Sequence, residues 1–308
     1  MGNLIGLKLL FSKYHSALNL SIALTISAAF WGLFWIPLRQ IESSGISASW
    51  TVIIFNAFPL IVLVPLFFLF FSKFKQSLKP ILYASLAIGM AITFYSKGLV
   101  ETTVIRATLL FYLTPIWSTI FGIIWLSEKL TFSRIASIII AIIGLLLLLS
   151  GSHSVYKPLN IGDFYGLMSG IFCGLGATFI NRWSNMNIIP LTLFCFIFST
   201  IFSLFFPLYF VPEILPDLSL IINSIYTIFI WANLLLLPSF CIIFFTAKFL
   251  SPGRVGILMM SEVIVAMFSA SILIPDEKMF PIQWLGAFAI LLAGFYEVIL
   301  NFVRFNIF

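Results

Sequence analysis

The chain has 308 residues, of which 62% are hydrophobic and 8% are charged, and its mean hydropathy is +1.17. Soluble domains carry roughly 25% charged residues, so 16 basic and 10 acidic side chains are too few to cover a surface that faces water. This composition excludes a soluble enzyme, a nucleic-acid binder, a disordered chain and a secreted disulfide scaffold. The formal charge of +6 therefore points to membrane topology rather than to a polyanion site.

Long apolar runs predict an all-α integral membrane protein with ten transmembrane helices. A spanning helix needs about 20 apolar residues, and the runs lack the alternating pattern of a membrane barrel. We expect a short interfacial helix or a tail before the first run. In chain order, the predicted spans are 19–38, 50–71, 80–97, 104–126, 133–150, 162–181, 189–210, 221–249, 255–274 and 282–303.

The distribution of Lys and Arg predicts the orientation of these spans. With the N-terminus inside, eleven of the sixteen basic residues lie on the cytoplasmic side and five lie outside. Basic residues are enriched in cytoplasmic loops, so both termini are expected in the cytoplasm. The sequence therefore predicts a multi-pass protein, and we expect it in a bacterial inner membrane.

Weak self-similarity predicts an internal repeat. An offset of 142 residues carries Trp31-Gly32 to Cys173-Gly174 and Pro65 to Pro207. Further on, Ser127-Glu-Lys parallels Asp276-Glu-Lys at an offset of 149. These matches predict two five-helix halves, 1–155 and 156–308. Because five is odd, the two halves must enter the membrane in opposite senses, which is an architecture of secondary transporters.

Two stretches carry a resemblance to a known family. The run from Ala107 through Pro115 to Glu128-Lys-Leu-Thr, followed by Gly144, resembles the EamA module of the drug/metabolite transporter superfamily. Phe30-Trp-Gly resembles the start of that module, and Arg254–Glu262 is similar to its second copy. The resemblance implies ten helices and the transport of small metabolites such as amino acids, often outward. Some relatives carry nucleotide sugars or other phosphorylated compounds. The second half departs from the pattern, since Val263 replaces a proline.

Glu262 is the foremost candidate for a functional residue. It lies near the middle of span 255–274, and a central carboxylate that faced lipid would be costly. Met259, Ala266 and Ser269 share its helix face, so this face is expected to point into the bundle. Glu262 would then bind a substrate amine or take up a proton that couples to transport. The alternative is a purely structural hydrogen bond to the neighbouring span, to a residue such as Asn233 or Thr246.

Aromatic side chains supply a second set of candidates. Trp31 and Trp35 are one turn apart in the first span, where the resemblance places a substrate cavity. With Tyr95 and Tyr112 they would form an aromatic box for an apolar, aromatic or cationic solute. Ordinary helix packing is the competing interpretation for each of the four residues.

Four more residues have predicted roles outside this box. Arg106 and Lys97 bracket the outer ends of spans 80–97 and 104–126, where either would attract an anionic group or extend toward the headgroups. Pro115 and Pro238 are nearest the midplane and are the predicted bending points.

These observations predict a secondary-active transporter of small organic metabolites. It would move an amino acid or a similar solute by alternating access, as an exporter, and proton coupling is a further possibility. One alternative is an importer or exchanger of phosphorylated or nucleotide-linked metabolites; another is a membrane scaffold or an intramembrane enzyme. The expected partners are a small-molecule solute and the lipid bilayer, with protons and a second copy of the chain as further candidates. We expect no nucleic acid, no cofactor, no metal and no catalytic residues, because both histidines lie outside the spans.

Overall fold

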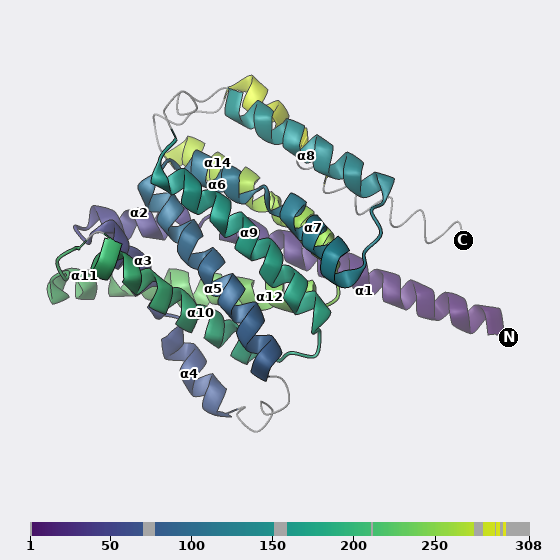
Figure 1. Cartoon of the computed structure of the whole chain (residues 1–308), viewed down its shortest axis with the longest axis horizontal. Helices are drawn as coiled ribbons and strands as arrows, with labels where there is room; N and C mark the ends of the chain where they lie inside the picture. The colour runs from purple at the N-terminus through teal and green to yellow at the C-terminus, as the bar shows by residue number, and fades with distance from the viewer. Residues whose placement is uncertain are drawn as a thin grey trace.

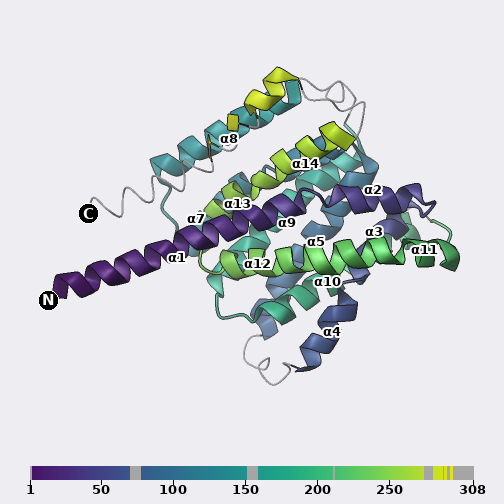
Figure 2. The ribbon, with the colours of Figure 1, turned by 180° about the vertical axis from the view of Figure 1, so that it is seen from behind.

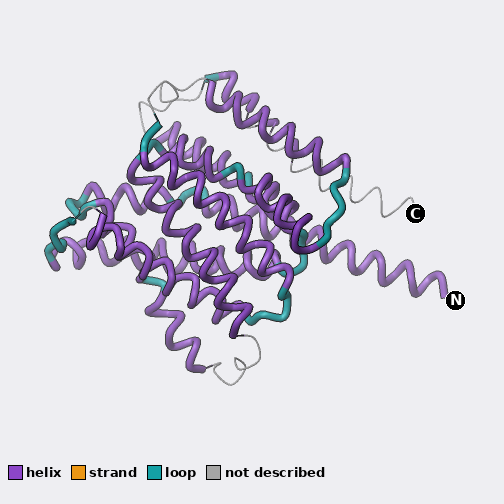
Figure 3. The backbone as a smooth tube through the Cα atoms, viewed as in Figure 1, coloured by secondary structure: helices purple, strands orange, loops and turns teal. Residues whose placement is uncertain are grey.

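The computed structural model describes residues 2–69, 78–150, 159–210, 212–273, 280–286, 288–289 and 292–293. Over these residues the regular secondary structure is helical and contains no strand (Figure 3), which confirms the predicted all-α class. The helices of the first half are α1 (Gly2–Trp31), α2 (Trp35–Ser43), α3 (Ala48–Ala57), α4 (Leu60–Leu69), α5 (Leu78–Glu101), α6 (Val104–Phe111), α7 (Thr114–Leu126) and α8 (Phe132–Ser150).

The second half continues with α-helices and two π-helical segments. They are α9 (Ile161–Arg182), α10 (Ile188–Phe205), η3 (Phe206–Phe210), α11 (Leu218–Phe229), η4 (Ile230–Leu236), α12 (Leu237–Ala247), α13 (Pro252–Met259) and α14 (Ser261–Leu273). α1 begins at Gly2 and continues into the first span, so the interfacial helix expected before that span is not a separate element.

Seven helical stretches among the described residues are long and apolar enough to cross a membrane. They correspond to seven of the ten predicted spans. Span 104–126 is not among them because it is divided into two helices, and its second part, Thr114–Leu126, is a shorter apolar helix. In span 133–150 the shorter apolar stretch is Arg134–Gly144. Span 282–303 lies largely outside the described residues.

Helix breaks occur near the middle of two predicted spans. α6 and α7 are separated by a turn at Tyr112 and Leu113, just before Pro115. A proline has no N–H to donate and its ring disfavours a continuous helix, which explains this break. α13 and α14 are separated at Met260, where Val263 stands in place of the family proline. The sequence did not predict this second break.

Other departures from regular helix lie close to predicted prolines. Pro238 occupies the first turn of α12, immediately after η4. π-Helical segments are rare and often occur at functional sites. The first span is also interrupted, at Gly32–Phe34, although its sequence predicts one continuous helix.

α9 lies at the centre of the bundle and packs along α5, α6 and α7 (Figure 1). Glycines allow this close contact. A Cβ atom on Gly170 would lie 2.7 Å from the Phe111 carbonyl oxygen, and one on Gly174 would lie 2.9 Å from the Ser118 nitrogen. Small residues let helices approach closely inside a membrane, so the predicted glycine ridge positions α9 against the broken helix.

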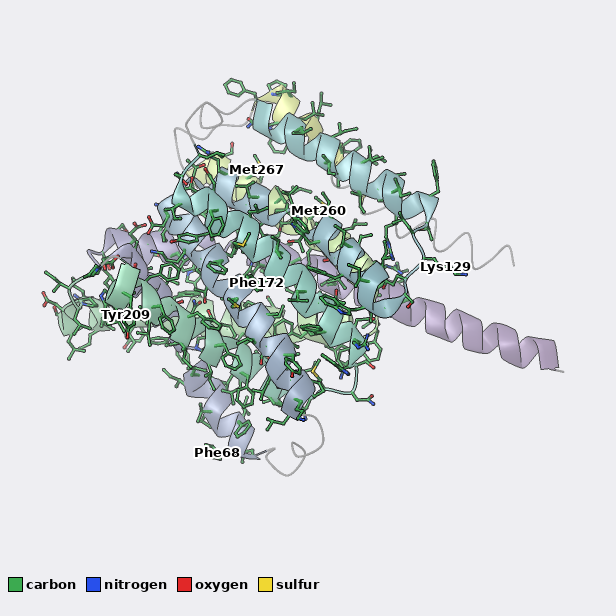
Figure 4. All side chains as sticks on the ribbon, viewed as in Figure 1. Phe68, Lys129, Phe172, Tyr209, Met260 and Met267 are labelled. Carbon is green, nitrogen blue, oxygen red and sulfur yellow. The ribbon has the colours of Figure 1, made fainter. Side chains whose placement is uncertain are left out.

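The other face of the bundle is formed by α1, α12, α13 and α14 (Figure 2). α1 packs against α12 on one side and against α13 and α14 on the other. Side chains fill the space between these helices (Figure 4), where Met260 and Met267 mark the break and the middle of α14. α8 lies at the margin of the bundle and contacts α13.

The bundle has two chemically different ends. At the end where α9 begins, Asp163 meets residues from α6 and from the segment after α5; we call this the acidic end. At the end where α9 finishes, Arg182 bonds to the Trp125 carbonyl and Asn181 bonds to the Leu250 carbonyl; we call this the basic end. The names follow the predicted outer and cytoplasmic sides, respectively.

Candidate functional site

Glu262 is completely buried in the first turn of α14. Its Oε1 atom accepts a 2.7 Å hydrogen bond from the Tyr95 hydroxyl on α5. Its Oε2 atom has no hydrogen-bond partner among the described residues. The break at Met260 places this carboxyl at a helix N-terminus, where the helix dipole favours negative charge. Glu262 therefore faces the bundle interior, as its depth in the sequence predicts.

Trp31 also faces this carboxyl. The indole is 5% exposed, and its Nε1–H has no hydrogen-bond acceptor among the described residues. The Trp31 ring stacks on Phe34 at 4.7 Å and meets the edge of Phe240 at 4.2 Å between ring centroids. A buried donor and a buried acceptor oxygen thus lie close together without satisfying each other, which leaves both available to a third group.

An apolar cavity lies beside this pair of groups. Its volume is about 550 Å³, including its open mouth. It is lined by Trp31, Ile88, Ala91, Ile92, Tyr95, Phe111, Cys173, Ala177, Ile180, Phe240, Ile243, Phe244, Ala247, Val255 and Met259. Glu262 does not line the cavity itself. Tyr95 does, and its hydroxyl connects the cavity wall to the carboxyl.

The predicted aromatic box is only partly assembled at this cavity. Trp31 and Tyr95 line it, with their ring centroids 6.1 Å apart. Trp35 and Tyr112 lie outside the lining and have structural partners instead. The Trp35 indole donates to Ser269 Oγ at 3.1 Å, and the Tyr112 hydroxyl donates to a main-chain carbonyl at the break between α13 and α14.

Asn233 and Thr246 do not bond to Glu262 in the described structure, so the predicted hydrogen bond from the neighbouring span is wrong. Thr246 donates to carbonyls of its own helix. Asn233 is 6% exposed in η4, and neither its amide nitrogen nor its amide oxygen has a partner among the described residues. The helices are close enough, but rotation about their axes directs Tyr95 rather than Asn233 at the carboxyl.

The two predicted cations at the outer mouth are buried and paired with acids. Arg106 Nη2 lies 2.5 Å from Asp163 Oδ2. Lys97 Nζ lies 2.6 Å from Glu101 Oε1 and donates to Ser49 Oγ at 3.0 Å. Lys97 is 2% exposed, so the alternative in which it extends to the headgroups is wrong. Neither cation lines the cavity.

The predicted bending residues lie at helix breaks. Pro115 follows the break between α6 and α7, and Gly256 of α13 packs against it, where an added Cβ would lie 3.0 Å from the proline Cα. Pro238 follows η4. The two broken helices therefore meet at their breaks, beside the cavity.

Sequence reasoning missed several residues of the site. Phe111, Phe240 and Met259 line the cavity, but nothing in a chain with 36 phenylalanines distinguishes them from packing residues. Cys173 also lines it. Its position was visible in the sequence, because an offset of 142 carries Trp31 onto it.

Comparison with known proteins identifies the first half of the chain. Residues 19–150 match the EamA-like transporter family, which confirms the predicted resemblance. The chain is therefore a multi-pass membrane protein that contains an EamA-like transporter module. Among curated proteins no match is found. A solved structure described as "Crystal structure of protein" shares the fold, with a TM-score of 0.69 at 13% identity over 93% of this chain and 97% of that chain.

Proposed function

We propose that this protein is a secondary-active transporter that exports a small organic solute by alternating access, with Glu262 as the proton-coupling group. The observation that carries the proposal is the buried Glu262–Tyr95 pair beside an apolar cavity, at the level where two broken helices meet. Substrate and coupling sites of secondary transporters characteristically lie at broken helices near the midplane. An intramembrane acid that faces the bundle interior is a functional candidate by default.

The proposed architecture has ten transmembrane helices in two inverted halves, 1–155 and 156–308. Matched contacts support it. Arg39 at the end of α2 donates to the carbonyls of Leu99 and Thr102 at the acidic end. Asn181 at the end of α9 donates to the carbonyls of Ala247 and Leu250 at the basic end. An offset of 142 relates the two donors, and an offset of 148 relates both pairs of acceptors.

Close helix contacts follow the same offsets. A Cβ atom on Gly32 would lie 3.0 Å from the Ala266 nitrogen, and one on Gly174 would lie 2.9 Å from the Ser118 nitrogen. The offset of 142 carries Gly32 to Gly174, and the offset of 148 carries Ser118 to Ala266. Two halves related in this way can exchange conformations around a central site, which is the basis of alternating access.

The chemistry of the cavity favours a solute with an apolar body. Its lining consists of apolar and aromatic side chains with the Tyr95 hydroxyl, the Trp31 indole N–H and the Cys173 thiol as polar groups. Arg106 and Lys97 are engaged with Asp163 and Glu101, so they do not offer an anion site at the cavity. The phosphorylated or nucleotide-linked alternative is therefore not favoured. An amino acid with an apolar side chain, or a similar solute, is the class we propose.

Orientation follows from the charges, with both termini in the cytoplasm of a bacterial cell and the acidic end outside. Basic residues at one end of the bundle, including Arg134, Arg182 and Arg254, support this assignment. Export then requires the solute to enter the cavity from the basic end and leave at the acidic end.

The test is flux into sealed vesicles that contain the purified protein. A thermal-shift screen against a metabolite library first finds a solute, because binding to the folded form raises the melting temperature with dose. We expect that solute to cross the membrane only in vesicles that contain the protein, faster with a proton gradient. A membrane scaffold or an intramembrane enzyme would give binding or turnover without flux.

A further inference from the structure

We propose that α6 is the gate of the acidic end, that the Arg106–Asp163 ion pair latches it, and that the protein therefore rests with its acidic end closed. This inference rests on the proposed alternating access. It adds two positioning residues that act on the gate rather than on the solute.

α6 has the form of a gate segment. It is an eight-residue helix that begins at the acidic end and stops at the break beside Pro115. α13 is its counterpart at the basic end, also eight residues long and ending at the break at Met260. The offset of 148 relates Arg106 of α6 to Arg254 of α13. Each short helix can therefore turn about its break without moving the longer helix that follows.

The latch joins α6 to the start of α9. The side chains of Arg106 and Asp163 are 8% and 4% exposed, and their nearest charged atoms are 2.5 Å apart. Asp163 also accepts a 3.3 Å hydrogen bond from the Thr102 hydroxyl and belongs to a capping box with Asn160. A buried ion pair with these additional bonds is strongly disrupted when one partner is removed.

The matching position at the basic end has no acid. The offset of 142 that relates α1 to α9 carries Ser21 to Asp163, so the residue that corresponds to the latch acid is an uncharged serine. Ser21 donates to the carbonyl of Ala17 within its own helix. The ion pair that holds α6 on α9 thus has no equivalent acid to hold α13 on α1.

Packing is unequal in the same sense. A Cβ atom on Gly162 would lie 2.8 Å from the Thr102 nitrogen, and one on Gly166 would lie 2.8 Å from the Ala107 carbonyl oxygen. The corresponding residues of α1 are Leu20 and Leu24. Glycines let α9 approach the acidic-end segments closely, whereas leucines keep α13 further from α1.

Other bonds at the basic end are compatible with this asymmetry. Glu128 pairs with Arg134 at 2.7 Å, but both residues belong to the first half, so this ion pair does not join the halves. Arg182 reaches from the second half to the Trp125 carbonyl, which is an uncharged acceptor. The cavity extends toward this end, as far as Ala247.

The test compares the reactivity of two matched cysteines. Leu99 and Ala247 are related by the offset of 148 and are each 2% exposed, one near each end. Leu99→Cys and Ala247→Cys are introduced separately into a chain in which Cys173, Cys195 and Cys241 are alanine. Labelling rates with a small methanethiosulfonate reagent are measured in detergent, so no solute is needed. We expect the Ala247→Cys site to react faster than the Leu99→Cys site in the parent.

Asp163→Asn and Arg106→Gln should each raise the labelling rate of the Leu99→Cys site about tenfold and lower that of the Ala247→Cys site, because the closed acidic end loses its ion pair. Arg106→Gln leaves the capping box intact. Asp217→Asn, the same change at an exposed position of the same end, is the matched control and should alter neither rate.

Ser21→Asp tests the latch from the opposite direction and keeps Arg106–Asp163 intact. An acid at this position should hold α13 on α1 and slow labelling of the Ala247→Cys site. Unchanged rates in folded Asp163→Asn or Arg106→Gln would overturn the proposal; if neither folds, unchanged rates in Ser21→Asp would do so. Flux in vesicles without any shift in labelling would leave the proposed transport standing and remove only the latch.

Discussion

The hydroxyl of Tyr95 donates a 2.7 Å hydrogen bond to Glu262 across 167 residues of sequence, from α5 in the first half to α14 in the second. The bond connects a residue of the cavity wall to a carboxyl that is completely buried behind it. Any event that changes the charge of Glu262 therefore acts on the shape of the cavity through Tyr95. Conversely, a solute that displaces the Tyr95 ring changes the environment of the carboxyl.

Glu262→Gln should abolish the dependence of flux on a proton gradient while the protein folds and binds its solute normally. Glutamine keeps the shape of the side chain and can still accept from Tyr95, but it cannot exchange a proton. The measurement is solute flux in vesicles with and without a pH difference, together with affinity from the dose dependence of the thermal shift.

Two other outcomes would assign Glu262 a different role. Loss of affinity in Glu262→Gln would indicate that the carboxylate binds a substrate amine directly. Parental flux with parental pH dependence would remove Glu262 from the mechanism, and unfolding of Glu262→Leu would then identify it as a structural group.

Tyr95→Phe should destabilise the protein by about 1–3 kcal/mol, because it leaves a buried carboxyl oxygen without its donor. We also expect it to alter the pH dependence of flux, since the link between cavity and carboxyl is lost. Tyr165→Phe is the matched control because no hydrogen bond engages its hydroxyl in the described structure. Equal melting temperatures for the two variants would contradict the importance of the Tyr95–Glu262 bond.

Trp31→Phe should weaken solute binding about tenfold with little change in melting temperature, since one hydrogen bond contributes about 1 kcal/mol. The argument is that the Nε1–H of Trp31 is buried beside the cavity without an acceptor and is available to the solute. Trp117→Phe removes another buried N–H that lacks an acceptor, away from the cavity lining, and should leave affinity unchanged. Equal losses of affinity would show that the effect is not local to the cavity.

Gly170→Val should destabilise the protein by about 1–3 kcal/mol through overpacking. A Cβ atom there would lie 2.7 Å from the Phe111 carbonyl oxygen, so α9 must move away from the broken helix. Phe164→Val places the same β-branched side chain on the exposed face of α9 and is the control. Thermal unfolding in detergent measures both, and a Gly170→Val variant as stable as the control would refute the close contact.

Cysteines placed near Lys129 and Arg182 should be protected from an impermeant thiol reagent added outside the cell. Cysteines near Glu42 and Asp217 should be labelled. This expectation follows from the charge distribution, which assigns the basic end to the cytoplasm. Labelling in the reverse pattern would overturn both the orientation and the opposed insertion of the two halves.

The sequence by itself determined that this protein is helical and lies in a membrane. A chain with so few charges has to satisfy its backbone polar groups within helices, whatever its neighbours are. It also determined that Glu262 faces protein, because a central acid is too costly in lipid. The break before Pro115 and the EamA resemblance were likewise readable from local residues.

Only the tertiary structure decided which groups meet. The partner of Glu262 is Tyr95 rather than Asn233, because helix rotation and separation choose among several polar side chains at similar depth. Lys97 and Arg106 pair with Glu101 and Asp163, since the way the helices pack brings acids to them before they reach the headgroups. Hydropathy records how deep a residue lies, but the direction in which its side chain points depends on the helices that pack around it.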